Sequence, residues 1–229
     1  MVASILTTTP PTGTGSVVFS ATDITIPAIS GYVPKLGDLL ILFGDQENQA
    51  ANVMTTADWA AAGATVVTAA NIGFTRGHWI TPAEVVAGTN AWTLSGQFDA
   101  NGQGRGIVAV VRGAGSVVVA TTQGVGTAAA PAAVTPAVEG SVILAHVACD
   151  NRSMSVTDPG AGWSTLQKSS SVTNVPSQIL MRRTALAPGG VAVNMTNAAV
   201  TLGSSDEWAA ITVALDHPAD SGGGVFACL

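Results

Sequence analysis

The stretch GDLLILFGD, residues 37–45, decides which fold this 229-residue chain is expected to adopt. Its apolar residues run without a break, and Gly, Asp and the nearby Pro34 enclose them, so the run is too short and too closely bounded for a helix. Continuous apolar runs of this length are typical of strands that are covered on both faces. We therefore expect a central β-strand within the segment Val33–Asp45.

A similar run, GSVILAHV, occupies residues 140–147, which is 103 residues later, and Pro136 precedes it. Matches in the same order follow each run: Trp59 with Trp163, residues 106–111 with residues 210–215, and residues 88–94 with residues 190–195. Such self-similarity indicates an internal repeat. The sequence therefore predicts two similar halves, at about 34–113 and 136–218.

The remaining apolar patterns predict further strands joined by turns and short helices. Strands are expected at Trp92–Ser95, Arg105–Arg112, Val117–Thr121, Val191–Met195 and Trp208–Asp216. Two short helical connectors are expected, at Thr55–Ala62 and at Thr81–Ala87, where Pro82 would stand in the first turn.

The composition also favours strands over helices. Only 10% of the residues are charged, which is too few for long surface helices, whereas the 26 Gly and 11 Pro suit turns between strands. Because the apolar runs of both halves are continuous, we expect the halves to share one core. The predicted fold is all-β: a two-sheet jelly-roll sandwich over residues 31–219, with an extended N-terminal arm at 1–30 and a Gly-rich C-terminal tail at 220–229.

The charge balance argues against two classes of partner. Eight Lys and Arg residues against fourteen Asp and Glu give a net charge of −6, so no basic surface is expected for nucleic acid or for anionic membranes. The first residues lack a basic start and meet Pro10 and Pro11 early, which is unlike a signal peptide. The sequence contains no run of 18 apolar residues, so no membrane-spanning helix is expected.

The sequence resembles a known group of proteins. The features that carry the resemblance are Gly37–Ile41, a Trp about 20 residues later, the strand GTNAWTL at 88–94 and the closing run IVAVVRG at 107–113. Together they are similar to the jelly-roll domains of virion structural proteins of tailed bacteriophages. The similarity extends roughly from Pro34 to Pro218, and its motifs are short and structural.

The resemblance implies a non-enzymatic part of a bacteriophage virion, made in the host cytoplasm. A capsid decoration or head-fibre protein is the first expectation, and a minor tail or tail-fibre protein that contacts a host receptor or glycan is the alternative. A free enzyme or a lectin-like protein is a third possibility. The implied partners are virion proteins, either the major capsid protein or tail proteins, and the resemblance implies three copies of the chain around a local axis. Association between copies is itself expected from the low charge and the charge-free ends of the sequence. The resemblance brings no catalytic residues.

Candidate chemical groups are few. His146 lies inside an apolar strand at the position that matches Phe43, so a core histidine is expected. We predict no catalytic set and no cofactor. Asp45, Glu47 and Asp150 follow the two central strands and offer oxygen ligands for calcium, but they lack the spacing of a calcium loop, so solvated turn residues are the expectation.

The C-terminal end offers a candidate contact with another subunit. Gly222–Gly224 form a spacer, and the apolar residues Val225, Phe226, Cys228 and Leu229 are expected to dock on a neighbouring subunit, the alternative being a disordered terminus. Cys149 is expected to be an unreactive buried thiol. Cys228 would then contact or bond another chain instead of pairing with Cys149.

Overall fold

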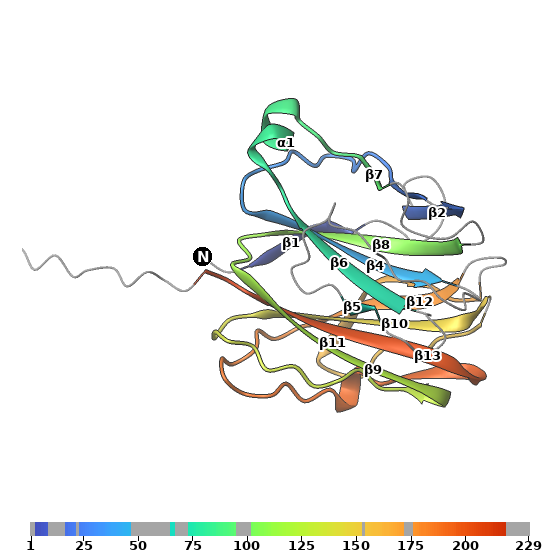
Figure 1. Cartoon of the computed structure of the whole chain (residues 1–229). Helices are drawn as coiled ribbons and strands as arrows, with labels where there is room; N and C mark the ends of the chain where they lie inside the picture. The colour runs from blue at the N-terminus through green and yellow to red at the C-terminus, as the bar shows by residue number, and fades with distance from the viewer. Residues whose placement is uncertain are drawn as a thin grey trace, which may run out of the picture.

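The computed structural model describes residues 3–8, 17–21, 23–46, 65–66, 73–94, 102–152, 154–171 and 176–218. Within these ranges the protein is all-β, with thirteen strands, one short α-helix, α1 (Pro82–Ala87), and one 3-10 turn, η1 (Thr196–Ala198). The strands form two antiparallel sheets that face each other (Figure 1).

Each half of the chain builds one sheet. The first sheet has the strand order β5-β6-β4-β8-β2-β3-β7, with β1 also paired to β8. Its strands are β1 (Ser4–Thr8), β2 (Val17–Ala21), β3 (Asp23–Ile26), β4 (Asp38–Gln46), β5 (Thr65–Val66), β6 (Gly73–Trp79), β7 (Trp92–Leu94) and β8 (Gly102–Arg112). The second sheet has the order β11-β12-β10-β13-β9. Its strands are β9 (Ser116–Ala129), β10 (Val142–Arg152), β11 (Trp163–Ser169), β12 (Pro176–Arg183) and β13 (Val200–Asp216).

The two sheets repeat one arrangement. In the first, β4 lies between β6 and β8, and in the second, β10 lies between β12 and β13. The register repeats as well, because Leu39 stands opposite Val111 while Val142 stands opposite Leu215. The runs that match in the sequence therefore occupy matching places in the two sheets.

The continuous apolar runs are buried on both faces, as alternating side chains require. Leu39, Ile41 and Phe43 of β4 point to the second sheet and pack there with residues such as Leu144. Leu40 and Leu42 point the other way, into a separate cluster under the α1–β7 segment. The second sheet has its own outer cluster, built around β10, β12 and β13 and the loops that cover them.

The facing strands show how the halves are related. Strand β4 packs on β10, β6 packs on β13, and β8 packs on β12. By their places in the sheets, β4 matches β10, β6 matches β12 and β8 matches β13. If each strand is replaced by its match, the β6–β13 contact becomes the β12–β8 contact and the β4–β10 contact stays the same. An approximate twofold axis therefore relates the two halves. Phe43 and His146, which are matching positions, meet near that axis with ring centroids 5.4 Å apart.

Several predicted elements can be compared with the structure. The helix predicted at Thr81–Ala87 is confirmed, and Thr81 caps it. The strand predicted at Val191–Met195 is wrong: Val193 donates one backbone hydrogen bond to Val134, and the Asn194 side chain then accepts from the Thr196 N–H and starts η1. A side chain that bonds its own backbone competes with strand pairing.

The N-terminal arm expected at residues 1–30 can be compared with the structure, whereas the helix expected at Thr55–Ala62 cannot. Residues 1–30 contribute β1, β2 and β3, and both β1 and β2 run along the same side of β8. The helix predicted at Thr55–Ala62, the partner tryptophan Trp59 and the tail at 220–229 lie outside the described residues.

Candidate functional site

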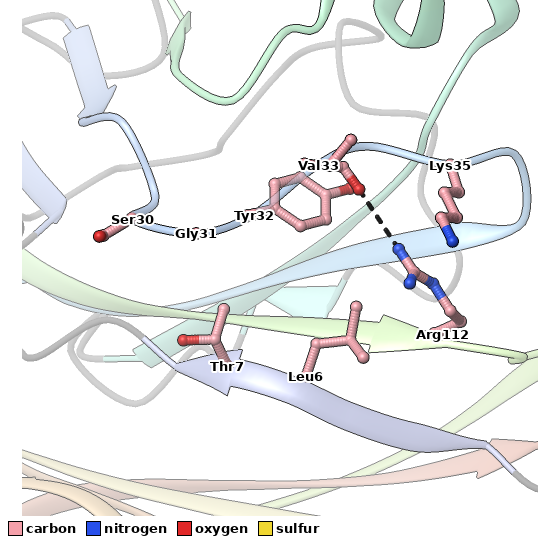
Figure 2. A pocket seen from close by; sticks show the side chains of 8 residues that line it. All are labelled: Leu6, Thr7, Ser30, Gly31, Tyr32, Val33, Lys35 and Arg112. Carbon is pink, nitrogen blue, oxygen red and sulfur yellow. Dashed lines mark hydrogen bonds between the residues drawn. The ribbon is translucent and has the colours of Figure 1, made fainter.

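A half-open pocket of about 470 Å³ lies at one end of the first sheet, between the loop at residues 30–35 and strand β1 (Figure 2). Its lining combines two cations, two aliphatic hydroxyls and two exposed apolar side chains. The lining residues are Leu6, Thr7, Ser30, Gly31, Tyr32, Val33, Lys35 and Arg112.

The loop is shaped by two tight turns. Tyr32 donates its backbone N–H to the Ile29 carbonyl at 3.2 Å, and Asp38 donates to the Lys35 carbonyl at 3.0 Å. Gly31 and Gly37 have φ angles of 73° and 82°, a left-handed conformation that glycine adopts without strain. These turns carry Lys35 over the end of β8.

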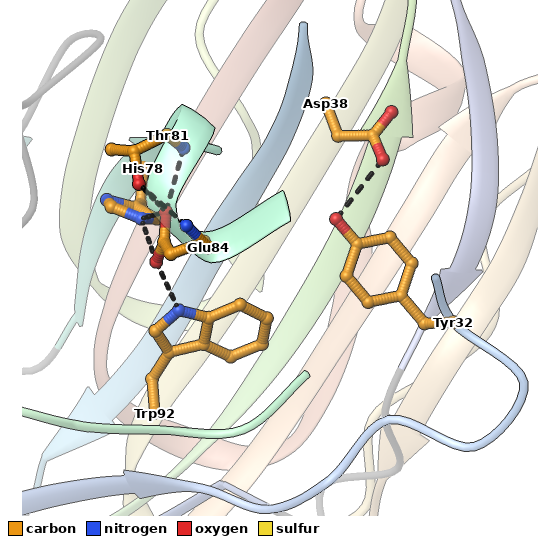
Figure 3. Close-up of polar contacts among 6 residues, drawn as sticks. All are labelled: Tyr32, Asp38, His78, Thr81, Glu84 and Trp92. Carbon is orange, nitrogen blue, oxygen red and sulfur yellow. Dashed lines mark hydrogen bonds and ion pairs between the residues drawn. The ribbon is translucent and has the colours of Figure 1, made fainter. Parts of the chain in front are cut away.

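The Asp38 carboxylate, which is fully buried, holds this corner together. It accepts two hydrogen bonds from Arg112, at 2.7 Å from Nε and 2.8 Å from Nη2, and one from the Lys35 backbone at 3.0 Å. The Tyr32 hydroxyl donates a further hydrogen bond to it at 3.2 Å (Figure 3). A buried charge needs such partners, and the two-point pairing of guanidinium with carboxylate is the strong form.

The same contacts fix the protonation of the groups around Asp38. Burial, reinforced by the nearby Asp38 charge, raises the pKa of the Tyr32 phenol well above its usual value, so Tyr32 stays a donor. The hydrogen bonds to Asp38 raise the pKa of Arg112. Tyr32 is therefore neutral and Arg112 is charged at pH 7.

Two groups of hydrogen-bond donors in the pocket are left without acceptors. Arg112 Nη2 also donates to the Val33 carbonyl at 3.3 Å, which leaves Nη1. Among the residues that the structure describes, neither Arg112 Nη1 nor the Lys35 ammonium has a hydrogen-bond acceptor. Figure 2 shows both side chains at one end of the pocket, with Leu6 and Thr7 on the opposite wall.

The matching corner of the second half is built without these cations. Ser141 and Asp216 take the places of Asp38 and Arg112. The buried Asp216 carboxylate accepts from the Ser141 hydroxyl, from the Ser116 hydroxyl at 3.3 Å and from the Ala137 backbone at 3.2 Å. Ala137 follows Pro136 as Lys35 follows Pro34, and each donates its backbone N–H to the buried carboxylate of its corner.

A second polar cluster fastens α1 to the first sheet (Figure 3). Glu84 accepts from Trp92 Nε1 at 2.7 Å and from the Thr81 backbone and hydroxyl, both at 2.8 Å, and it contacts His78 Nε2 at 2.8 Å. Burial alone would raise the pKa of Glu84, but these hydrogen bonds outweigh burial and lower it to about 2. The cluster is saturated by its own members, so we assign it a structural role.

A third polar group lies between the sheets. The prediction that His146 is a core residue is confirmed: it is fully buried, and its Nε2 lies 3.0 Å from Gln178 Oε1. Gln178 in turn donates to the Arg105 carbonyl at 3.2 Å. Burial lowers the pKa of His146 to about 4, so the ring is neutral at pH 7.

The other candidate residues are not brought together in the described parts. Asp45 was expected in a solvated turn, but it lies inside β4 and is fully buried, because β4 continues to Gln46. Glu47 and the side chain of Asp150 lie outside the described residues, as do Val225, Phe226, Cys228 and Leu229. Within those limits, no group of three His, Cys, Asp or Glu residues is placed to hold a metal.

Cys149 is buried in β10, as expected, and its thiol donates to the Ser177 carbonyl at 3.1 Å. A smaller pocket of about 370 Å³ lies beside Trp163 and Arg183. There Nη1 of Arg183 donates to the carbonyls of Ala185 and Leu186.

Sequence reasoning did not find Tyr32, Lys35 and Arg112. Arg112 and Asp38 are 74 residues apart and meet only because β4 and β8 pair in one register. A usable signal was the scarcity of basic residues: of the eight, Lys35 stands just before the run expected as a central strand, and Arg112 ends the strand expected to close the first half.

Comparison with known proteins adds no relative. No protein-family model, no curated protein and no solved structure matches the chain at a significant level. In the part of the chain that the structure describes, no helix is long and apolar enough to span a membrane.

Proposed function

We propose that this chain is a non-enzymatic structural component of a bacteriophage virion. In this proposal it is a capsid decoration or head-fibre protein that binds the capsid surface and either stabilises the capsid or is displayed on it. The proposal rests on the short motifs around the two central strands and on the all-β frame with two facing sheets. In this proposal the frame is a jelly-roll type in which each half supplies a whole sheet.

Strand β9 is the feature that carries an assembly role. It is 14 residues long, contains no charged residue, and stands at the end of the second sheet in the described structure. Exposed sheet edges bind further strands, and natural proteins usually protect them with charges, bulges or short length. The opposite edge, β11, is better protected: it is 7 residues long, half the length of β9, and it carries Lys168.

The proposal is tested with separated particle parts. Purified heads and purified tails of the phage that encodes the chain are incubated with labelled protein and recovered by sedimentation. Co-sedimentation with heads at a fixed number of copies per capsid supports the decoration role. Binding to tails alone favours the alternative below, and binding to neither part contradicts a virion role.

A minor tail or tail-fibre protein that contacts a host receptor or glycan is the second candidate. The pocket at Lys35 and Arg112 favours it, because it presents unused donors next to hydroxyls and exposed apolar side chains. Adsorption of the labelled protein to host cells, and competition with whole phage for adsorption, tests this candidate.

A further inference from the structure

We propose that the pocket between β1 and the loop at residues 30–35 binds an acidic saccharide, with its carboxylate on Lys35 and Arg112. This inference deepens the second candidate function and names the ligand class. It is carried by the unused donors of the pocket, by its net charge and by the contrast between the two halves of the chain.

The donor arrangement fits a carboxylate. Arg112 is held rigidly by Asp38 and Val33, and it leaves the two N–H groups of Nη1 for a ligand. The exposed Lys35 ammonium stands beside it. A guanidinium fixed in this way binds a carboxylate at little entropic cost.

The charge of the corner discriminates between anions. Two cations and the buried Asp38 carboxylate leave one positive charge, which matches a single carboxylate. A phosphate monoester carries about 1.5 to 2 negative charges at pH 7, so the single positive charge of the corner would neutralise only part of its charge. In a chain of net charge −6, a local positive site also concentrates anions where the rest of the surface repels them.

The second half shows that the fold does not need these cations. Its matching corner closes around Asp216 with two serine hydroxyls and the Ala137 N–H. Lys35 contributes only its backbone N–H to Asp38, a role that Ala137 fills in the other half. The Lys35 ammonium is therefore available for a purpose other than stability.

The remaining lining suits a sugar ring. A volume of about 470 Å³ lies in the usual range of small-molecule pockets. The hydroxyls of Thr7 and Ser30 offer donors and acceptors for ring hydroxyls. Leu6 and Val33, with exposed fractions of 42% and 68%, offer apolar contact for the C–H face of the ring.

The test is isothermal titration calorimetry of the full chain with two sugar acids, glucuronate and N-acetylneuraminate. Glucose, acetate and inorganic phosphate serve as comparison probes. Binding of one or both sugar acids that exceeds the binding of glucose, acetate and phosphate is expected. Lys35→Gln should weaken this binding about tenfold or more, since hydrogen bonds to charged groups are the strong ones. Arg112→Lys should weaken it as well, and circular dichroism checks its folding because Arg112 also holds Asp38.

Lys168→Gln is the matched control, because this lysine lies on β11 outside the pocket, and it should leave binding unchanged. Equal binding of acetate or phosphate would overturn the saccharide assignment, and unchanged binding by Lys35→Gln would overturn the site. These outcomes are separate from the virion proposal. The titration uses the isolated chain, whereas the virion role is judged by sedimentation with heads and tails.

Discussion

At the scale of single residues, the most consequential substitution between the halves is His146 in place of Phe43. Both side chains lie at the approximate twofold axis and contact each other, so an ionisable ring sits in the middle of the core. Gln178 satisfies one ring nitrogen, and burial keeps the ring neutral. A buried neutral histidine makes a fold sensitive to acid.

The first prediction follows from this histidine. Its pKa is about 4 in the folded chain against 6.5 for the ordinary group, so the unfolded state binds a proton first as the pH falls. The free energy of unfolding should therefore drop between about pH 6.5 and 4, by on the order of 3 kcal/mol. Urea unfolding at a series of pH values measures this slope.

His146→Phe, which repeats the residue of the first half, is the matched variant. It should unfold with a flatter dependence on pH over the same interval, whatever its stability at pH 7. An identical slope in both proteins would show that another group causes the acid sensitivity.

At the scale of elements, α1 is held by one carboxylate. Glu84 joins the helix start at Thr81 to β6 through His78 and to β7 through Trp92. The helix has only six residues and no fully buried side chain, so it depends on these polar contacts.

We expect Glu84→Gln to lower the free energy of unfolding at pH 7 by about 1–2 kcal/mol, because an amide cannot accept all four hydrogen bonds. The pKa of Glu84 is lowered to about 2, so its contribution is present above about pH 4.5 and disappears as the pH falls toward 2. Chemical unfolding at pH 7 and pH 3 checks both statements, with Glu139→Gln in an exposed turn as the control. Equal losses in the two variants would contradict the role of Glu84.

Strand β9 carries the assembly prediction at this scale. Thr121→Lys places a charge on the uncharged edge at an exposed position, which should abolish attachment to particles while unfolding and circular dichroism stay unchanged. Ser164→Lys on β11 is the control, and it should attach normally. Normal attachment of the β9 variant would remove β9 from the interface.

The elements also show where sequence reasoning succeeds and fails. The runs at 37–45 and 140–147 could be placed as central strands because burial on both faces leaves a continuous apolar pattern. The segment 191–195 has an alternating pattern but forms no strand, because the Asn194 side chain accepts a hydrogen bond from the nearby Thr196 backbone N–H. The pocket could not be predicted, since its cations meet only through the register of β4 and β8.

At the scale of the whole molecule, the repeated halves form one body around a shared central layer, with an additional apolar cluster on the outer face of each sheet. Trp163 belongs to the outer cluster of the second sheet and is 9% exposed. Its replacement by Ala should cost about 3–5 kcal/mol, the usual range for a packed tryptophan. A loss below 1 kcal/mol in chemical unfolding would contradict this packing.

The central claim, that this chain is a structural part of a virion, is tested most directly by locating it in particles. Cryo-electron microscopy of purified phage that carries this gene should show, at repeated positions on the head surface, density into which the two facing sheets fit. Density only at the tail would select the alternative role. Particles in which neither the maps nor mass spectrometry detect the chain would contradict the account.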